Sequence, residues 1–140
     1  MQSIYLAGGC FWCIEAVFLK LKGVQNVTPG YIGGVSKKPT YEEICKGNSG
    51  HAEAIRCDFG EKIISLEVIL QIFFVAHDPT QKNRQGNDIG TQYRSAIFYT
   101  NVEQRKKAEE SIKQAEKIYQ NTIQTELSDK LNFFVAEDYH

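Results

Sequence analysis

The residue with the clearest chemical potential is Cys10, which follows two glycines, Gly8 and Gly9. The residue pattern predicts a strand over 3–7 and a helix over about 11–22. The glycines let the backbone turn sharply between these two elements. Cys10 would then lie at the helix N-terminus, where unpaired N–H groups and the helix dipole favour the thiolate. We therefore predict a reactive thiol at Cys10 rather than a small buried core residue.

Two aromatic residues, Phe11 and Trp12, follow Cys10 directly, and Trp12 is the only tryptophan in the chain. Aromatic side chains commonly fill the core of a protein. At a helix N-terminus beside a nucleophile, they could instead form an apolar pocket for a small group such as a methyl. The spacing alone leaves both interpretations open.

The four cysteines also bear on metal binding and redox state: Cys10, Cys13, Cys45 and Cys57. A disulfide scaffold is not expected, because the chain shows no secretory signal and is long enough to form a core without cross-links. Cys10 and Cys13 have the spacing of half a zinc site, but no second pair of closely spaced cysteines or histidines follows. We therefore expect no metal and assign the cysteines to redox chemistry or to the core.

Length and charge define the class of protein. The chain has 140 residues, which predicts one catalytic domain over 1–140. Its formal net charge of −1 argues against nucleic acid or an anionic membrane as a partner. The most apolar stretch, residues 63–76, is too short to span a bilayer and contains Glu67 and Gln71. We expect a cytoplasmic protein.

The coarse pattern alternates strands with helices. Strands are expected at 3–7, 24–32 (interrupted at Pro29-Gly30), 52–59, 93–100 and 131–135. Helices are expected at 11–22, at 41–46, after a Ser65 cap to near His77, and from an Asn101 cap over 102 to about 124. A polar loop over 78–90 is long enough to suggest a function. This order predicts a two-layer α/β sandwich with a mixed sheet.

Glu53 is the candidate general acid. If residues 52–59 form a strand, alternate side chains share one face: Glu53, Ile55, Cys57 and Phe59. A carboxyl in such apolar surroundings should have a raised pKa and remain protonated near neutral pH, as a general acid requires. The alternative is a buried salt bridge between Glu53 and either Arg56 or Arg94.

Several separated motifs resemble those of one family. They are Gly9-Cys10-Phe11-Trp12 with Glu15, Thr40-Tyr41-Glu42-Glu43-Ile44, Gly50-His51-Ala52-Glu53-Ala54, His77-Asp78-Pro79-Thr80, Asp88-Ile89-Gly90-Thr91-Gln92-Tyr93-Arg94-Ser95 and Ala136-Glu137-Asp138-Tyr139-His140. In type and order they resemble segments of the A-type peptide methionine sulfoxide reductases, over nearly the whole chain. The resemblance implies a ferredoxin-like sandwich with peripheral elaborations. It also implies reduction of the S epimer of methionine sulfoxide, free or in proteins, and thus protein repair.

The resemblance also implies residue roles. Cys10 would attack the sulfoxide sulfur and become a sulfenic acid, and Glu53 would protonate the sulfoxide oxygen. Phe11 and Trp12 would hold the substrate methyl. Three further residues would bind the oxygen or order the site: Tyr41, Asp88 and Tyr93. No bound cofactor is implied; the reductant would be an external thiol, with thioredoxin as the expected partner.

The resolving thiol departs from the family pattern. Many members carry resolving cysteines in a C-terminal tail, whereas no cysteine follows Cys57 in this sequence. We expect Cys57 to be inert in the core. Cys13 is then the first candidate, because C-x-x-C at a helix start is typical of dithiol redox pairs. Cys45 and an external thiol remain alternatives.

Other readings of the sequence remain open. Cys10 and Cys13 could serve a thioredoxin-like disulfide exchanger, or the chain could be a non-enzymatic module that binds oxidised methionine. For the histidines we predict supporting roles: structural support of the Glu53 strand for His51, and surface or capping positions for His77 and His140.

Overall fold

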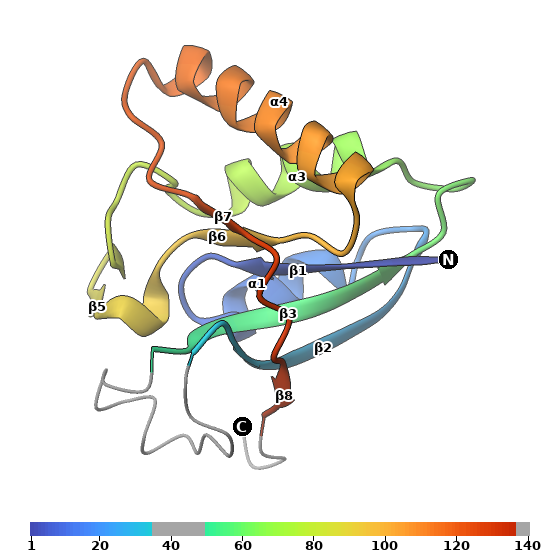
Figure 1. The fold of residues 1–140 in the computed structure, drawn as a ribbon, viewed down its shortest axis with the longest axis horizontal. Helices are drawn as coiled ribbons and strands as arrows, with labels where there is room; N and C mark the ends of the chain where they lie inside the picture. Colours follow the sequence, from blue (N-terminus) through green and yellow to red (C-terminus); the bar gives the residue numbers. More distant parts are fainter. Residues whose placement is uncertain (35–49, 137–140) are drawn as a thin grey trace.

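A six-stranded mixed sheet organises the chain (Figure 1). The computed structural model describes residues 1–34 and 50–136. The strands lie in the order β7-β6-β1-β3-β2-β8. Neighbours pair antiparallel except β6 and β7, which are parallel. Their bounds are β1 Gln2–Ala7, β2 Val24–Ile32, β3 Ala52–Phe59, β6 Ala96–Phe98, β7 Glu126–Ser128 and β8 Phe134–Val135.

The helices of the described residues pack on one face of the sheet. They are α1 Phe11–Phe18, α3 Leu66–Ala76 and α4 Val102–Tyr119. The main core lies between this face and the helices, and it includes Leu6 of β1, Ile55 of β3 and Phe73 of α3. The opposite face carries a smaller cluster with Ala54 and Phe98, and the chain from β7 to β8 crosses in front of the sheet (Figure 1). The predicted two-layer architecture is confirmed.

Two elements follow the sequence pattern closely. Strand β3 has the predicted bounds, and its side chains are buried on both faces except Arg56. Helix α3 begins after Ser65, whose hydroxyl accepts a hydrogen bond from the Val68 N–H at 3.3 Å. These predictions are confirmed, since alternation and capping are local signals.

The first helix and the strand after it differ from the prediction. Helix α1 ends at Phe18, and turns follow up to Gly23, which has a φ of +98°. Strand β2 runs without a break through Pro29-Gly30. An added Cβ at Gly30 would lie 2.4 Å from the Phe134 carbonyl oxygen. This glycine therefore serves the close approach of β8 rather than a turn.

The second half contains shorter elements than predicted. A 3₁₀ helix, η1 (Thr91–Tyr93), precedes the short β6, and α4 ends at Tyr119 because Gln120 adopts a left-handed φ of 53°. The polar loop contains a small hairpin of β4 (Arg84–Gln85) and β5 (Asp88–Ile89). The last strand covers only Phe134–Val135, and β7 was not predicted. The predicted helix over 41–46 lies outside the described residues.

Helix α4 forms an outer layer and is rich in charged residues. Only its inner side is buried, at Gln104, Ala108, Ser111 and Ala115.

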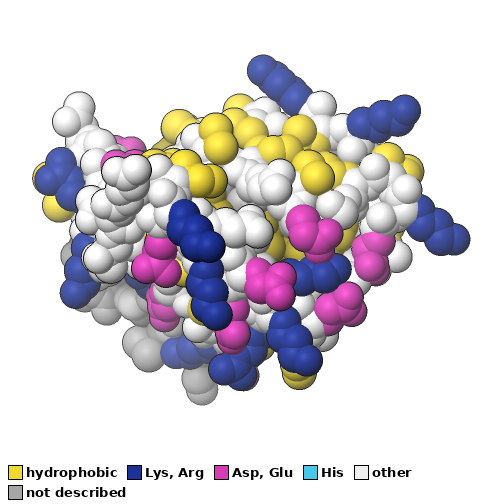
Figure 2. Space-filling model, turned by 90° about the horizontal axis from the view of Figure 1, so that it is seen from above, with side chains coloured by type: hydrophobic (Ala, Val, Ile, Leu, Met, Phe, Trp, Pro, Cys, Tyr) yellow, Lys and Arg dark blue, Asp and Glu magenta, His cyan; other side chains and the backbone are white. Residues whose placement is uncertain are grey.

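Seen from above, the surface mixes charged side chains of both signs with a group of hydrophobic ones (Figure 2). Exposed Val75 of α3 and Ile118 of α4 line an apolar groove between the two helices. None of the helices in the described part of the chain is long and apolar enough to cross a bilayer.

Candidate active site

Cys10 is the N-cap residue of α1, as the strand–glycine–helix pattern predicts. Its carbonyl oxygen accepts hydrogen bonds from the N–H groups of Cys13 at 3.1 Å and Ile14 at 3.4 Å. Gly9 has a φ of +89°, a backbone conformation that residues with a Cβ rarely adopt. The turn therefore presents Cys10 at the first turn of the helix, half-buried.

The net direction of the Cys10 pKa shift differs from the prediction. Burial is the largest influence and raises the pKa of the thiol. The backbone N–H of Trp12 lowers this pKa, and the charge of Glu53 raises it again. The prediction that the helix start favours a thiolate is therefore wrong in its net direction. Desolvation and a neighbouring carboxyl together outweigh the N–H groups.

Glu53 lies on the helix-bearing face of β3 and is only 2% exposed. Its Oε1 accepts a hydrogen bond from the backbone N–H of Phe11 at 3.2 Å. Burial raises the pKa of Glu53 to about 7, against the lowering effect of the Phe11 N–H, and the charge of Asp88 raises it further. The predicted raised pKa has the physical cause expected for a carboxyl on an apolar strand face.

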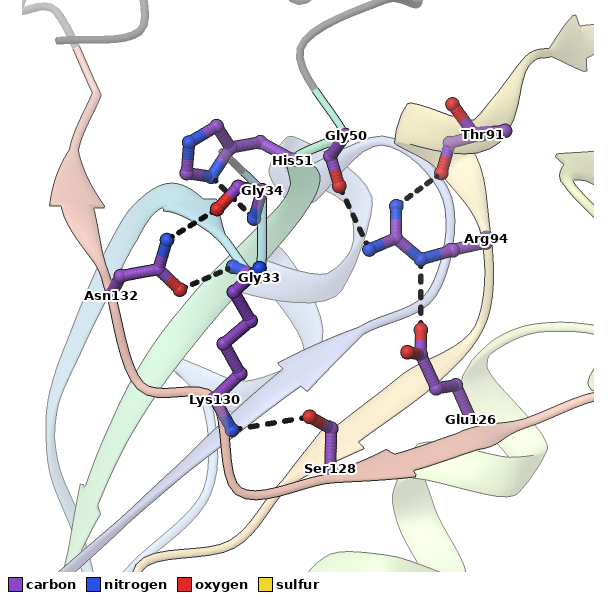
Figure 3. A network of polar contacts seen from close by, with 10 residues as sticks. All are labelled: Gly33, Gly34, Gly50, His51, Thr91, Arg94, Glu126, Ser128, Lys130 and Asn132. Atoms are coloured by element: carbon purple, nitrogen blue, oxygen red, sulfur yellow. Dashed lines mark hydrogen bonds and ion pairs between the residues drawn. The ribbon is translucent and has the colours of Figure 1, made fainter. Parts of the chain in front are cut away.

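The salt-bridge alternative for Glu53 is wrong, because both candidate arginines are paired elsewhere. Arg56 Nε lies 3.1 Å from Asp58 Oδ1. Arg94 Nε lies 2.9 Å from Glu126 Oε2, and its other nitrogens donate to the carbonyl oxygens of Thr91 and Gly50 (Figure 3).

The two aromatic residues after Cys10 have different surroundings. Phe11 is 2% exposed, and its ring centroid lies 5.7 Å from that of Tyr31. Trp12 is 48% exposed, with a centroid distance of 6.4 Å to Phe11. Phe11 is thus part of the core, whereas Trp12 presents an apolar ring to solvent two residues after the thiol.

The structure describes two of the three remaining predicted substrate residues, Asp88 and Tyr93. Asp88 is exposed on β5, and its charge contributes to the raised pKa of Glu53. Tyr93 is half-buried in η1, which packs against β3. Tyr41 lies outside the described residues. The structure therefore brings Cys10, Phe11 and Glu53 together at one end of the sheet.

The other cysteines divide by exposure. Cys13 is exposed on α1, three residues after Cys10. Cys57 is buried, and desolvation raises its pKa to about 12, so it is inert as predicted. Cys45 lies outside the described residues. Across residues 1–34 and 50–136, no group of histidine, cysteine and carboxylate side chains could hold a metal ion.

Two histidines support the structure. His51 is buried, and its Nδ1 accepts the N–H of Gly34 at 3.1 Å, so its predicted structural role is confirmed (Figure 3). His77 is the C-cap residue of α3, as one of its predicted roles requires, but it is 7% exposed rather than on the surface. Its ring nitrogens lie 2.7 Å from the Phe73 carbonyl oxygen and 2.7 Å from Ser95 Oγ. His140 lies outside the described residues.

Sequence reasoning missed the side chains that fix the backbone around the site. Asn132 accepts the N–H of Gly33 at 3.1 Å and donates to the carbonyl oxygen of Gly34 at 2.6 Å (Figure 3). Gln85 packs against Gly9. No local pattern identifies such residues, because their partners are distant in sequence.

The site places a half-buried thiol near a buried carboxyl whose pKa is raised, and such groups can serve nucleophilic and general-acid catalysis. Comparison with known proteins identifies the family. The family profile described as "Peptide methionine sulfoxide reductase" matches residues 2–140. The "Peptide methionine sulfoxide reductase MsrA" of Acinetobacter baumannii (strain AYE) is 53% identical over 140 residues, which cover 100% of this chain and 80% of that protein.

Solved structures of other proteins also resemble this chain in their fold. Reduced Mxr1 from Saccharomyces cerevisiae superimposes with a TM-score of 0.94 at 33% identity, covering 99% of this chain and 81% of that one. Mxr1 in complex with Trx2 has the same fold, with a TM-score of 0.72 at 23% identity over 99% of this chain and 82% of that one.

The chain therefore belongs to the peptide methionine sulfoxide reductase family. It is an oxidoreductase that reduces methionine sulfoxide. This finding decides against the disulfide exchanger and the non-enzymatic binding module.

Proposed function

We propose that Cys10 is the nucleophile, that Glu53 is the general acid, and that the substrate is the S epimer of methionine sulfoxide, free or in oxidised proteins. The observation that carries this assignment is the hydrogen bond from the Phe11 N–H to Glu53 Oε1 at 3.2 Å. It holds a buried carboxyl beside the residue that follows Cys10. A nucleophile and an acid thus act on one sulfoxide group.

The chemistry follows from the two protonation states. Sulfoxide oxygen is a poor leaving group until it is protonated, and a Glu53 with a pKa of about 7 retains a proton to donate. The Cys10 thiol releases its proton to solvent and attacks the sulfoxide sulfur, while Glu53 protonates the oxygen. The oxygen passes to Cys10 as sulfenic acid, and methionine leaves. Cys10 sulfur loses two electrons, substrate sulfur gains two, and solvent reprotonates Glu53.

Substrate binding involves the exposed groups around this pair. We assign Trp12 and Phe11 to the substrate methyl, with the half-exposed Trp12 ring as the contact surface. Tyr41, Asp88 and Tyr93 bind the oxygen or order the site. The charge of Asp88 acts on Glu53 directly, which supports its place in this group.

For the resolving step, Cys13 is our first choice. Positions three apart on a helix are neighbours, and Cys13 is accessible where Cys10 is half-buried. Its thiol would displace water from the Cys10 sulfenic acid and form a disulfide. An external thiol, with thioredoxin as the expected donor, would reduce that disulfide, and no bound cofactor is needed. The complex of yeast Mxr1 with Trx2 supports this choice of reductant. Cys45 and direct attack by an external thiol remain alternatives.

We place this activity in the cytoplasm and in a single catalytic domain over 1–140. One main core cluster, running from Ile4 to Ala136, supports the single domain.

Two measurements test the proposal. Incubation with dithiothreitol and each epimer of a methionine sulfoxide ester should consume only the S epimer; consumption of the R epimer at a similar rate would contradict the assignment. Oxidation by one equivalent of substrate without reductant, followed by peptide mapping, should give a Cys10–Cys13 disulfide. Loss of a single thiol, with dimedone bound to Cys10, would instead show that an external thiol resolves the sulfenic acid.

A further inference from the structure

The backbone turn that presents Cys10 is contacted from the loop after α3. An added Cβ at Gly8 would lie 2.9 Å from His77 Cγ, and one at Gly9 would lie 2.7 Å from Gln85 Cγ and 2.9 Å from Gln85 Cβ. Gly9 has the left-handed φ of +89° and no side chain of its own to fix it. The methylene groups of Gln85 therefore pack directly against the Cα of Gly9.

The carboxamide of Gln85 makes two hydrogen bonds to the backbone of Asp78. Its Oε1 accepts the backbone N–H of Asp78 at 2.8 Å, and its Nε2 donates to the carbonyl oxygen of Asp78 at 2.6 Å. Asp78 is itself held, since its Oδ1 accepts hydrogen bonds from the Thr80 N–H at 3.0 Å and the Thr80 hydroxyl at 2.6 Å. The contact with Gly9 thus has a rigid support.

We propose that Gln85 is a positioning residue that holds the Gly9 hinge and thereby fixes the Cys10 sulfur relative to the carboxyl of Glu53. The inference rests on the proposed roles of Cys10 and Glu53. Rotation at Gly9 would displace the next residue, Cys10, while the Glu53 strand stays in the sheet. An error of about 1 Å between reacting groups can lower a rate by roughly 10²-fold. Gln85 would therefore act on the rate of the reductive step and not on substrate affinity.

The test compares three variants in single-turnover reduction of the S sulfoxide. Gln85→Ala removes Cγ and the carboxamide and keeps only Cβ, whereas Gln85→Met keeps both methylene groups at Gly9 and removes the carboxamide. Gln81→Met is the matched control: Gln81 Oε1 accepts the N–H of Gly86 at 2.8 Å in the same loop. The control removes a hydrogen bond from this loop without removing the contact with Gly9.

Gln85→Ala should lower the single-turnover rate constant by roughly 10- to 100-fold, with less than a twofold change in substrate Kd. Gln85→Met should recover part of this loss, and Gln81→Met should lose less than about twofold. Iodoacetamide should alkylate Cys10 at lower pH in Gln85→Ala, because a displaced thiol is less buried and burial raises its pKa. Mapping separates Cys10 from Cys13.

Equal losses in Gln85→Ala and Gln81→Met would overturn the proposal, since the loop as a whole would then be responsible. A native rate in Gln85→Ala, or a loss confined to Kd, would overturn it as well. Failure of the proposed function is distinguishable, because in that case Cys10→Ser would retain turnover whatever residue stands at 85.

Discussion

Glu53 and His77 are both buried titratable side chains, but they are satisfied in different ways. Within the described residues, the Glu53 carboxyl accepts one hydrogen bond, from the Phe11 N–H, and retains an oxygen and a proton for other partners. Both ring nitrogens of His77 are hydrogen-bonded, to the Phe73 carbonyl and to Ser95, whose hydroxyl continues to Thr125 at 2.8 Å. The proposed general acid therefore keeps bonding capacity for a substrate, whereas His77 uses both ring nitrogens within the fold.

The pKa values of Glu53 and His77 show the same contrast, because they are shifted in opposite directions. Desolvation favours the neutral form of each group, so it raises the pKa of Glu53 from 4.5 to about 7 and lowers that of His77 from 6.5 to about 4. At neutral pH the carboxyl is poised to give up a proton, while the imidazole stays neutral. Only the first condition is useful to an acid catalyst.

The largest effect expected is on the rate. Glu53→Gln keeps the acceptor oxygen for the Phe11 N–H but has no acidic proton, so the single-turnover rate constant should fall by roughly 10²- to 10⁴-fold. Rapid quench with quantified methionine measures it. A rate within twofold of native would remove Glu53 from the mechanism and with it the contrast to His77.

The pH dependence of this loss sharpens the comparison. The native rate constant is proportional to the fraction of Glu53 that is protonated, whereas the rate constant of the variant does not depend on that fraction. The ratio of native to Glu53→Gln rate constants should therefore be constant below about pH 7 and fall about tenfold per pH unit above it. A ratio that stays flat to pH 9 would show that the carboxyl donates no proton.

Opposite stability profiles are expected for the two groups. The raised pKa of Glu53 means that the native state loses about 3 kcal/mol, relative to the unfolded chain, as pH rises from 4.5 to about 7. The lowered pKa of His77 means that a similar amount is lost as pH falls from 6.5 to about 4.

Urea unfolding across pH 4 to 8 tests both. Glu53→Gln should remove only the loss toward neutral pH, and His77→Gln only the loss toward acid, on top of its own cost of about 1–3 kcal/mol for broken hydrogen bonds. If the pH dependence of the free energy of unfolding is the same in both variants as in the native protein, the opposite pKa shifts of Glu53 and His77 would be contradicted.

The smallest effect concerns the tyrosines assigned to the oxygen. Tyr41→Phe and Tyr93→Phe each remove one donor, worth about 1 kcal/mol, so each should lower the single-turnover rate constant by less than tenfold. The double variant should lose more than either single variant. Full activity in both single variants would exclude them from oxygen binding.

Local signals explain how much of the fold was predictable. Strand β3 and helix α3 carry alternation and a Ser65 cap within their own sequence. Strand β7 has only three residues, and its pairing with β6 is set by tertiary contacts. The same holds for Gly30, which resembles a turn residue in sequence but lies in β2 because β8 packs against it.

The positions of the proposed catalytic residues were predictable from the sequence, whereas the net direction of the Cys10 pKa shift was not. Cys10 and Glu53 follow from the glycine turn, the strand alternation and the family motifs. The net pKa direction of Cys10 does not, because the sequence shows neither the depth of burial nor the carboxyl held at Phe11. Gln85 was missed for a similar reason, since its partners Gly9 and Asp78 are brought to it only by the folded chain.

The most direct test of the central claim is a single-turnover reaction of Cys10→Ser with one equivalent of S sulfoxide, beside Cys13→Ser and the native protein. Native protein and Cys13→Ser should each release one methionine per chain at similar rates, because Cys13 acts only after the oxygen has passed to Cys10. Cys10→Ser, a near-isosteric change, should fold normally and release no methionine. Methionine release by Cys10→Ser at an appreciable fraction of the native rate would contradict the account.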